Sequence, residues 1–205
     1  MSAPEELFSL IRGRRSVRKF LKEPVERGTV ERLVEWATWA PSAGNRQDWH
    51  FTVVTSPEVL GRMNEAIRRS WDAVLSEAGG KGAVADAVRY VSRHSGVLGA
   101  PALVVVSTRE VDALQRRLFP GNAEVAVGGV ISAAMAAQNL MLAAHAEGLG
   151  SCCMTGPLVA AKELKEISGL GPRQQVVCVI ALGRPDEAPA APPRKPVSEV
   201  ATFVP

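Results

Sequence analysis

A short run of cations around a hydroxyl group is the first feature of this chain with the chemistry to bind a ligand. Six basic residues lie within eleven positions: Arg12, Arg14, Arg15, Arg18, Lys19 and Lys22. Ser16 adds a hydroxyl between guanidinium groups, which bind phosphate through paired, charge-assisted hydrogen bonds. The segment therefore suits a phosphate. A solvated basic edge or an arm for nucleic acid is the alternative, although aromatic residues for stacking on single strands are scarce here.

A second polar segment, residues 41–48, gathers hydroxyl and amide groups in one loop that leads to Trp49 and Phe51. The amides of Asn45 and Gln47 offer both donors and acceptors, which suits a flat heterocycle that carries the same groups. Trp49 and Phe51 alternate into a predicted strand, and this strand fixes the loop to a rigid element. The alternative is a helix stop followed by a turn, since Ser, Gly and Asn favour turns for local reasons.

Composition and length bound the class of protein. The chain has 205 residues, 46% hydrophobic and 22% charged, which is typical of a globular protein and fits a single domain over residues 1–205. The net charge of +3 favours an anionic ligand without choosing between a phosphate cofactor and nucleic acid. The three cysteines, Cys152, Cys153 and Cys178, imply no disulfide framework and lack C-x-x-C spacing, so we expect them to pack.

Several common sites and targeting segments are absent from the sequence. It contains no G-x-G-x-x-G, P-loop, H-E-x-x-H or G-x-S-x-G motif, and its three histidines show no metal spacing. We therefore expect no metal site and no catalytic side chain of these types. The N-terminus lacks the order of a signal peptide, and no apolar run reaches the roughly 20 residues of a membrane span. These absences favour a cytoplasmic protein without a membrane partner.

The elements that must position these residues follow from hydrophobic periodicity. Helices are predicted over residues 5–11, from a cap at Thr29 to residue 40, from a cap at Ser56 to residue 78, and over 83–99, 123–147 and 157–167. A strand is predicted over 50–55, buried strands over 102–107 and 175–182, and a short strand or loop over 151–155. Residues 185–205 are proline-rich and read as an extended tail. Helices with scattered strands indicate a layered α+β domain.

The two polar segments together resemble the nitroreductase family of FMN-dependent oxidoreductases. The matching features are the Arg-Arg-Ser-x-Arg start and the Pro-Ser-x-x-Asn-x-Gln-x-Trp-x-Phe loop. The resemblance implies a nitroreductase-like α-β-α sandwich and an intertwined homodimer with two FMN sites at its interface. It is weak between residues 56 and 121, where the family builds substrate lids. Lys81, Arg89 and Arg93 are candidates for a further flavin contact there.

The resemblance also implies a set of flavin contacts in this chain. By this resemblance, the FMN phosphate and the N1–O2 side of the ring are contacted by Arg14, Arg15, Ser16 and Arg18. A loop that reaches the partner's flavin contributes Pro41, Ser42, Ala43, Asn45 and Gln47. Main-chain N–H groups at Met154, Thr155 and Gly156 face N5 and O4 of the ring. Arg194 and Lys195, held between prolines, close over the phosphate.

The activity implied by the resemblance is a ping-pong reaction. NAD(P)H passes a hydride to flavin N5, and a small-molecule acceptor such as a nitroaromatic or quinone is then reduced. Relatives also dehalogenate aromatics, oxidise azolines or fragment the flavin with oxygen, so these reactions are alternatives on the same fold. A nucleic-acid-binding module that uses the basic segment is the third hypothesis. We expect a homodimer that binds no nucleic acid.

Overall fold

A four-stranded antiparallel sheet forms the centre of the computed structural model, which describes residues 2–93, 96, 99–110, 117 and 127–204. The strands are β1 (Trp49–Val54), β2 (Ala102–Arg109), β3 (Gly150–Met154) and β4 (Gln174–Gly183). They lie in the order β1-β2-β4-β3, and each neighbouring pair is antiparallel. The two strands with continuous apolar sequences, β2 and β4, therefore occupy the centre, and β3 lies at one edge.

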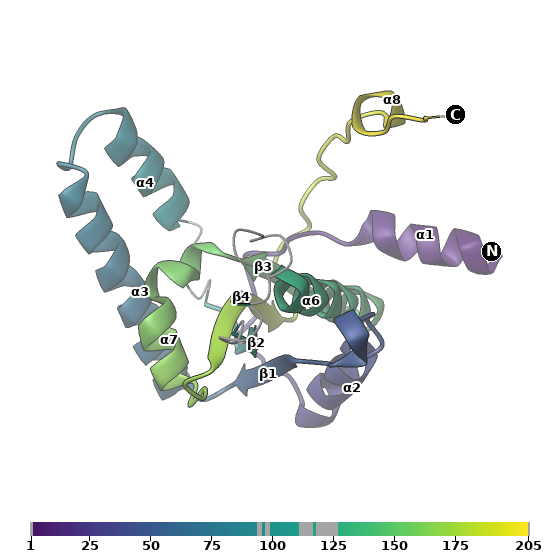
Figure 1. Cartoon of the computed structure of the whole chain (residues 1–205), viewed down its shortest axis with the longest axis horizontal. Helices are drawn as coiled ribbons and strands as arrows, with labels where there is room; N and C mark the ends of the chain where they lie inside the picture. The colour runs from purple at the N-terminus through teal and green to yellow at the C-terminus, as the bar shows by residue number, and fades with distance from the viewer. Residues whose placement is uncertain (1, 94–95, 97–98, 111–116, 118–126, 205) are drawn as a thin grey trace.

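Helices cover both faces of this sheet, as the sequence predicts (Figure 1). α3 (Pro57–Glu77) and α7 (Ala161–Ile167) pack on one face, where Met63 and Leu164 are fully buried against Val105 of β2. α2 (Arg27–Ala37) and α6 (Gly128–Ala146) pack on the other, where Leu33 and Leu140 are fully buried. Because side chains alternate along β2, its residues divide between two separate cores. The observed architecture is the predicted layered α+β fold.

The predicted start of the second helix is wrong. Thr29 does not cap α2, because the helix begins at Arg27 and its N-cap is Glu26. The earlier start places Val30 in a regular helical turn, facing the sheet together with Leu33. The helix also ends at Ala37, before the residue that precedes Pro41. The apolar periodicity identified the buried face correctly, but it did not fix the ends.

Other predicted elements agree more closely. Ser56 caps α3 as predicted, and its hydroxyl accepts a hydrogen bond from the main-chain N–H of Val59. The predicted helix over 157–167 begins as the 3₁₀ segment η3 (Gly156–Ala160) before α7, and α4 (Ala83–Arg93) is shorter than its predicted range. The predicted start of the central helix, residues 123–126, lies outside the described residues. The tail is extended apart from one turn, α8 (Val197–Val200).

Residues 16–21 of the basic N-terminal segment cross the ends of β3 and β4, and we call this stretch the strap. The main-chain N–H of Val17 donates to the Ser151 oxygen at 3.0 Å, and that of Leu21 donates to the Arg184 oxygen at 3.0 Å. Gly150 makes room for this crossing, since a Cβ atom there would lie 2.9 Å from the Cβ atom of Val17. The strap places Ser16 beside Ser151 in a parallel bridge. Small residues at the strand ends therefore bring the cations to the sheet edge.

Two apolar segments project from the body of the chain (Figure 1). α1 (Ala3–Gly13) has no buried residue, and Phe8 is 62% exposed. The tail beyond β4 carries Phe203, which is 85% exposed. Large apolar groups in water are unfavourable, so both segments are suited to contact another surface. Among the described residues, no helix is long and apolar enough to cross a membrane.

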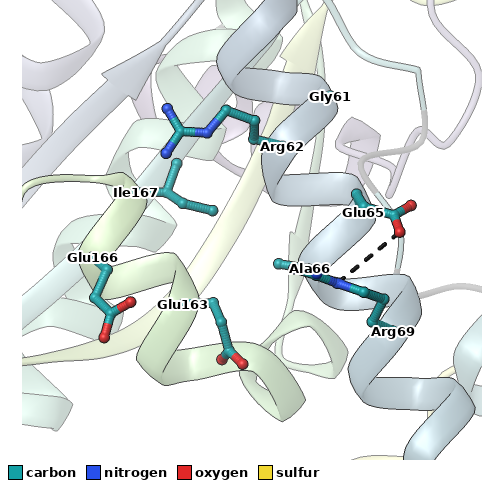
Figure 2. Close-up of a pocket in the computed structure, with 8 residues that line it drawn as sticks. All are labelled: Gly61, Arg62, Glu65, Ala66, Arg69, Glu163, Glu166 and Ile167. Carbon is teal, nitrogen blue, oxygen red and sulfur yellow. Dashed lines mark ion pairs between the residues drawn. The ribbon is translucent and has the colours of Figure 1, made fainter.

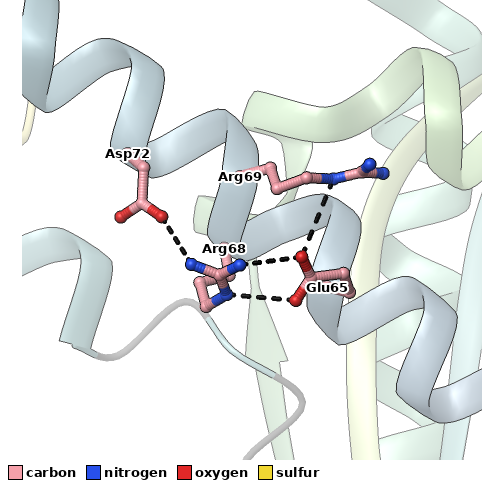
Figure 3. A network of polar contacts seen from close by, with 4 residues as sticks. All are labelled: Glu65, Arg68, Arg69 and Asp72. Atoms are coloured by element: carbon pink, nitrogen blue, oxygen red, sulfur yellow. Dashed lines mark hydrogen bonds and ion pairs between the residues drawn. The ribbon is translucent and has the colours of Figure 1, made fainter.

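Charged side chains line the outer face of α3. Arg68 lies 2.7 Å from oxygens of both Glu65 and Asp72, and Arg69 also approaches Glu65 (Figure 3). These side chains are half exposed or more. Exposed ion pairs contribute little to stability because water screens them. The network keeps this face polar and has no evident part in ligand binding.

Candidate functional site

A cavity of about 450 Å³ lies at the end of β3. It brings together residues from two separate predicted motifs, with Arg18 from the basic segment and Met154, Thr155 and Gly156 from the segment after the central helix. The strap described above explains this meeting, because it fixes the cations beside β3. The remaining lining comes from Cys152 and Cys153 of β3 and from Tyr90 and Val91 of α4.

Main-chain donors are available at the floor of this cavity. Gly156 opens the 3₁₀ segment η3, and the first N–H groups of a helix have no partner within it. Within the described residues, the N–H groups of Thr155 and Gly156 donate no main-chain hydrogen bond outside helices and strands. The site can therefore present two neutral donors next to the cation of Arg18. This donor set suits a ligand that carries both an anionic group and a polar ring edge.

The arginines of the basic segment have different roles. Arg15 closes the end of α1, since its Nη1 donates to the main-chain oxygens of Arg12, Gly13 and Arg14 at 2.7, 3.1 and 2.9 Å. A cation at a helix C-terminus satisfies carbonyl groups that have no partner within the helix. Arg18 is exposed, and among the described residues its side chain hydrogen-bonds only to the Ser16 oxygen, from Nη1 at 3.3 Å. Arg18 is thus better placed for a ligand than Arg15.

The electrostatics of this end of the chain are positive. Burial lowers the pKa of His145, and the charges of Arg14 and Arg15 lower it further. The imidazole packs under the end of α1, where a Cβ atom at Gly13 would lie 2.8 Å from Nε2. A neutral His145 leaves the positive potential to the arginines. Its contact with the end of α1 is structural and helps to hold α1 on α6.

The Pro41–Gln47 loop is strained and ordered by its own polar groups. Asn45 and Gln47 have φ of 51° and 50°, a left-handed conformation that is rare outside glycine. The Ser42 hydroxyl accepts from the Gln47 N–H at 3.1 Å, and the Gln47 amide donates to Asn45 Oδ1 at 3.2 Å. The Ala43 N–H donates to Ser132 Oγ on α6 at 3.3 Å. Strain held this firmly is typical of binding loops.

This loop does not line the β3 cavity of its own chain. It is attached to the N-terminal end of α6, whereas the basic segment is attached to β3. Both Asn45 and Gln47 are exposed. The two predicted halves of the site are therefore held on different elements.

The tail cations are also separate from the cavity within one chain. Arg194 and Lys195 are exposed, and Arg194 hydrogen-bonds only to the oxygens of Pro192 and Pro193 within the described residues. The start of the tail is anchored more firmly. The Glu187 carboxylate accepts from the main-chain N–H groups of Arg18 and Lys19. The direction of the tail is thus fixed at the basic segment, while its cations remain available to a ligand.

Four lining residues were not predicted as ligand contacts: Tyr90, Val91, Cys152 and Cys153. Cys153 was expected to pack, yet it is exposed, because adjacent residues on a strand face opposite sides and only Cys152 points into the core. Strand alternation was the signal that could have found it. Tyr90 lies in the region of weak resemblance, where no signal pointed to it. Of the candidates named there, Arg89 pairs with Asp86 at 2.9 Å and therefore serves α4 itself.

Two other cavities lack the predicted residues. One, of about 490 Å³, lies between α3 and α7, with Arg62, Glu65 and Arg69 on the α3 wall and Glu163 and Glu166 on the α7 wall (Figure 2). Its opposite charges suit water and surface ions more than an aromatic ring. The second, of about 420 Å³, lies near Lys22 and the start of α3. Of these three cavities, the β3 cavity alone is lined by residues predicted to contact the flavin.

Comparison with known sequences agrees with the fold and the motifs. A sequence model of the nitroreductase family matches residues 11–184, which is most of the chain, so this protein belongs to the nitroreductase family. It is 30% identical over 189 residues to 5,6-dimethylbenzimidazole synthase of Rhodobacter capsulatus, covering 89% of this chain and 84% of that protein. It is 25% identical over 241 residues to 4-nitrobenzoate reductase of Nocardioides, covering 100% and 92% of the two chains.

Among solved structures, the chain is similar to a BluB-like flavoprotein from Clostridium difficile 630. The TM-score is 0.84 with 28% identity, and the match covers 97% of this chain and 99% of that one. This agreement confirms the predicted nitroreductase-like fold. The relatives named here carry out different reactions by name, so family membership does not choose the reaction of this protein.

Proposed function

We propose that this protein is an FMN-dependent oxidoreductase whose flavin binds in the β3 cavity. The observation that carries the proposal is the meeting of Arg18 with Thr155 and Gly156 in one cavity, because it joins a cation to main-chain donors. A flavin mononucleotide needs both, since it has a phosphate at one end and a hydrogen-bonding ring at the other. The relatives include a protein named as a flavoprotein, which supports the proposal.

Each end of the cofactor has suitable groups in this chain. Arg14, Ser16 and Arg18 offer charge-assisted and hydroxyl hydrogen bonds to the phosphate and the polar side of the ring. The N–H groups of Thr155 and Gly156 offer neutral donors to the ring edge, which stabilise negative charge there. Arg194 and Lys195 extend from a tail that begins beside Arg18, so they can complete the phosphate site.

The reaction we propose uses NAD(P)H as the electron donor and a nitroaromatic, a quinone or a similar small molecule as the acceptor. When bound, FMN supplies the redox chemistry by accepting a hydride and then reducing the acceptor. The chain binds and orients these molecules. Tyr90 and Val91 provide an apolar wall on the α4 side of the cavity. No side chain of the cavity is required as a proton donor in this proposal.

A second copy of the chain completes the proposed site. α6 exposes Ile131 (48%) and Met135 (44%) on the side away from the sheet, and α1 and the tail project with exposed apolar residues. An exposed apolar face of this kind favours a homodimer. The strained loop around Asn45 and Gln47, which lies on α6 at the same end, then reaches the partner's cavity. This arrangement accounts for a binding loop that does not line its own cavity.

The test is anaerobic mixing of the FMN-loaded protein with NADH and with NADPH. We expect the visible flavin absorbance to bleach rapidly with at least one of them, and to return when a quinone or nitroaromatic is added. Full loading with FMN but no bleaching by either donor would contradict the proposed donor. That result would still support the proposed FMN site, and it would favour another flavin reaction over reduction by NAD(P)H.

Oxygen-dependent fragmentation of the flavin is a second candidate, favoured by a specific observation. The relative with 30% identity is named 5,6-dimethylbenzimidazole synthase, and the similar structure with the TM-score of 0.84 is BluB-like. Dimethylbenzimidazole carries the same dimethyl-substituted benzene ring as a flavin. Aerobic incubation with chemically reduced FMN separates the two candidates. An oxidoreductase returns intact FMN, whereas fragmentation consumes it and releases a benzimidazole that mass spectrometry detects.

A further inference from the structure

The three cysteines differ sharply in their surroundings. Cys152 and Cys153 are neighbours on β3, so their side chains point to opposite faces of the sheet. Cys152 is 3% exposed and belongs to the core on the α3 side. Cys153 is exposed on the other face and lines the β3 cavity. Cys178 on β4 is buried at 4% exposure. Only Cys153 combines access to solvent with a place in a cavity.

The neighbours of Cys153 favour its thiolate. In the β3–β4 register Cys153 pairs with Ile180, so Cys178 is its diagonal neighbour on the same face. The Cys178 thiol donates a hydrogen bond to Cys153 sulfur, which together with the charge of Arg14 outweighs burial and lowers the pKa of Cys153 to about 7. Burial raises the pKa of Cys152, and the shared hydrogen bond raises that of Cys178. Low pKa and access coincide at one thiol.

We propose that Cys153 is a redox modification site that exchanges with small anionic disulfides entering the β3 cavity. Arg18 in the cavity wall and Arg14 nearby attract an anionic disulfide, and Cys153 meets it at the surface. The Cys153 thiolate attacks one sulfur atom of the disulfide. A mixed disulfide forms, the original S–S bond breaks, and the other half leaves as a thiolate. Cys153 is oxidised and the small disulfide is reduced, so the electrons balance.

The consequence for function rests on the proposed flavin site. The attached group occupies the cavity beside Thr155 and Gly156, so it competes with the flavin ring for the same space. A small thiol reverses the reaction by a second exchange. Cys178 assists by hydrogen bonding and does not close a disulfide with Cys153. Diagonal neighbours across antiparallel strands have Cα atoms about 7–8 Å apart, beyond the usual range of about 4.4–6.8 Å for a disulfide.

The direct test uses 5,5′-dithiobis(2-nitrobenzoate), an anionic aromatic disulfide, on the native protein without FMN. We expect one fast thiol per chain and two that react only after denaturation. Cys153→Ser should remove the fast thiol. Cys152→Ser, at the adjacent buried position, should keep it, and circular dichroism of each variant confirms folding. A fast thiol that persists in folded Cys153→Ser protein, or its absence from the native protein, would overturn the proposal.

A pH series tests the role assigned to Cys178. The rate of the fast reaction should rise with pH and reach half its maximum near the Cys153 pKa of about 7. Cys178→Ala removes the hydrogen-bond donor, so the midpoint should move upward toward that of an ordinary thiol, and the rate at pH 7 should fall by about tenfold. Cys152→Ala should leave the midpoint in place. An unchanged midpoint in Cys178→Ala would refute this thiol pair.

FMN added before the reagent separates this inference from the proposed function. If both hold, saturating FMN slows the fast reaction at least about tenfold, as expected for a ligand that covers the thiol. If FMN does not bind while one thiol at Cys153 still reacts fast, the proposed function fails and the modification site stands. If FMN binds without protecting Cys153, the competition for the cavity is refuted.

Discussion

At the scale of single residues, the arginines of the basic segment are close in sequence but have different contacts and therefore different roles. Arg15 is committed to the end of α1 through three main-chain oxygens, whereas Arg18 faces the cavity. Arg14 precedes both in the sequence, and its charge acts on both His145 and Cys153. Residue type alone made these arginines equivalent. Their hydrogen bonds assign Arg15 to structure and leave Arg14 and Arg18 for an anion.

The phosphate assignment predicts a difference between flavins. Arg14→Ala should weaken FMN binding by tenfold or more, because a hydrogen bond to a charged group contributes about 1.5–3 kcal/mol and about 1.4 kcal/mol is a factor of ten. Riboflavin lacks the phosphate, so its binding should be weak in the wild type and little changed in the variant. Fluorescence titration measures both ligands. Arg27→Ala, on the exposed side of α2, is the matched control. Equal wild-type affinities for FMN and riboflavin would rule out the assignment.

The main-chain assignment predicts an effect at Gly156. Its place at the start of η3 gives it a right-handed backbone, so a side chain there is not strained in itself. A valine would instead place methyl groups where the ring edge is proposed to lie. Gly156→Val should reduce FMN occupancy or slow flavin reduction, as measured by stopped-flow absorbance. Gly171→Val, where a Cβ atom meets nothing within 4 Å, should change neither. Normal occupancy and reduction in Gly156→Val would contradict the assignment.

At the scale of elements, the strap across β3 and β4 determines where the cations lie. Two glycines that pair in the sheet register, Gly150 and Gly183, leave space for Val17, Phe20 and Pro101. The strap can therefore lie against the sheet because these two positions lack side chains, and hydrogen bonds then hold it there. η3 and the end of β3 line the same cavity as Arg18. The position of the cations that are proposed to bind the phosphate should therefore depend on these two glycines, although neither glycine is proposed to touch the ligand.

Gly150→Ala tests this dependence. The new Cβ atom would lie 2.9 Å from Val17 Cβ, so the strap must shift, at a cost of about 1–3 kcal/mol for an overpacked site. We expect a lower melting temperature and weaker FMN binding together. Gly28→Ala in α2 meets nothing within 4 Å and should be neutral or stabilising by up to about 1 kcal/mol. If the Gly150→Ala protein is destabilised but binds FMN with unchanged affinity, the position of the strap does not determine FMN binding.

Sequence patterns predicted local features of this chain better than long-range ones. The apolar runs of β2 and β4 and the cap at Ser56 follow from local chemistry, and the structure confirms them. The order β1-β2-β4-β3 joins strands far apart in sequence, and periodicity carries no information about such pairing. The left-handed backbone of Asn45 and Gln47 was equally hidden, since neither is glycine.

The candidate site shows the same limit. The motifs supplied the arginines and the Thr155–Gly156 pair, and the β3 cavity brings Arg18 to them. Cys153 and Tyr90 join that cavity only through the fold. The low pKa of Cys153 depends on Cys178, a diagonal neighbour from a strand more than twenty positions away. No cysteine motif in the sequence links two positions so far apart. Only the register of β3 and β4 shows that Cys153 and Cys178 are neighbours.

At the scale of the whole molecule, the groups of the proposed site lie in two separate places in one chain. The cavity side carries Arg18 and the main-chain donors, while the strained loop is attached to α6, whose outer face exposes Ile131 and Met135. α1 and the tail project from the body of the chain (Figure 1), and both carry exposed apolar residues. A homodimer explains all three observations at once. Replacing Ile131 by Asp should therefore release both the partner and FMN, whereas Val84→Asp on the exposed face of α4 should release neither.

Mixed dimers test the shared site most sharply. A chain with Arg14→Ala and Arg18→Ala has an intact loop, and a chain with Asn45→Ala and Gln47→Ala has intact arginines. Each alone should bind FMN poorly. When the two are unfolded and refolded together, the mixed dimer should regain one intact site, so about half of the mixed-dimer chains bind FMN. No recovery in confirmed mixed dimers would show that the loop does not serve the partner.

The central claim is that this chain holds FMN, and the visible absorption spectrum of the purified protein, reconstituted with FMN and freed of excess ligand, tests it most directly. The account predicts flavin bands at one FMN per chain, retained through gel filtration and released as intact FMN on denaturation. A colourless protein that takes up no FMN would contradict the account. If that protein bound DNA with a steep dependence on salt, the basic segment would belong to a nucleic-acid-binding module instead.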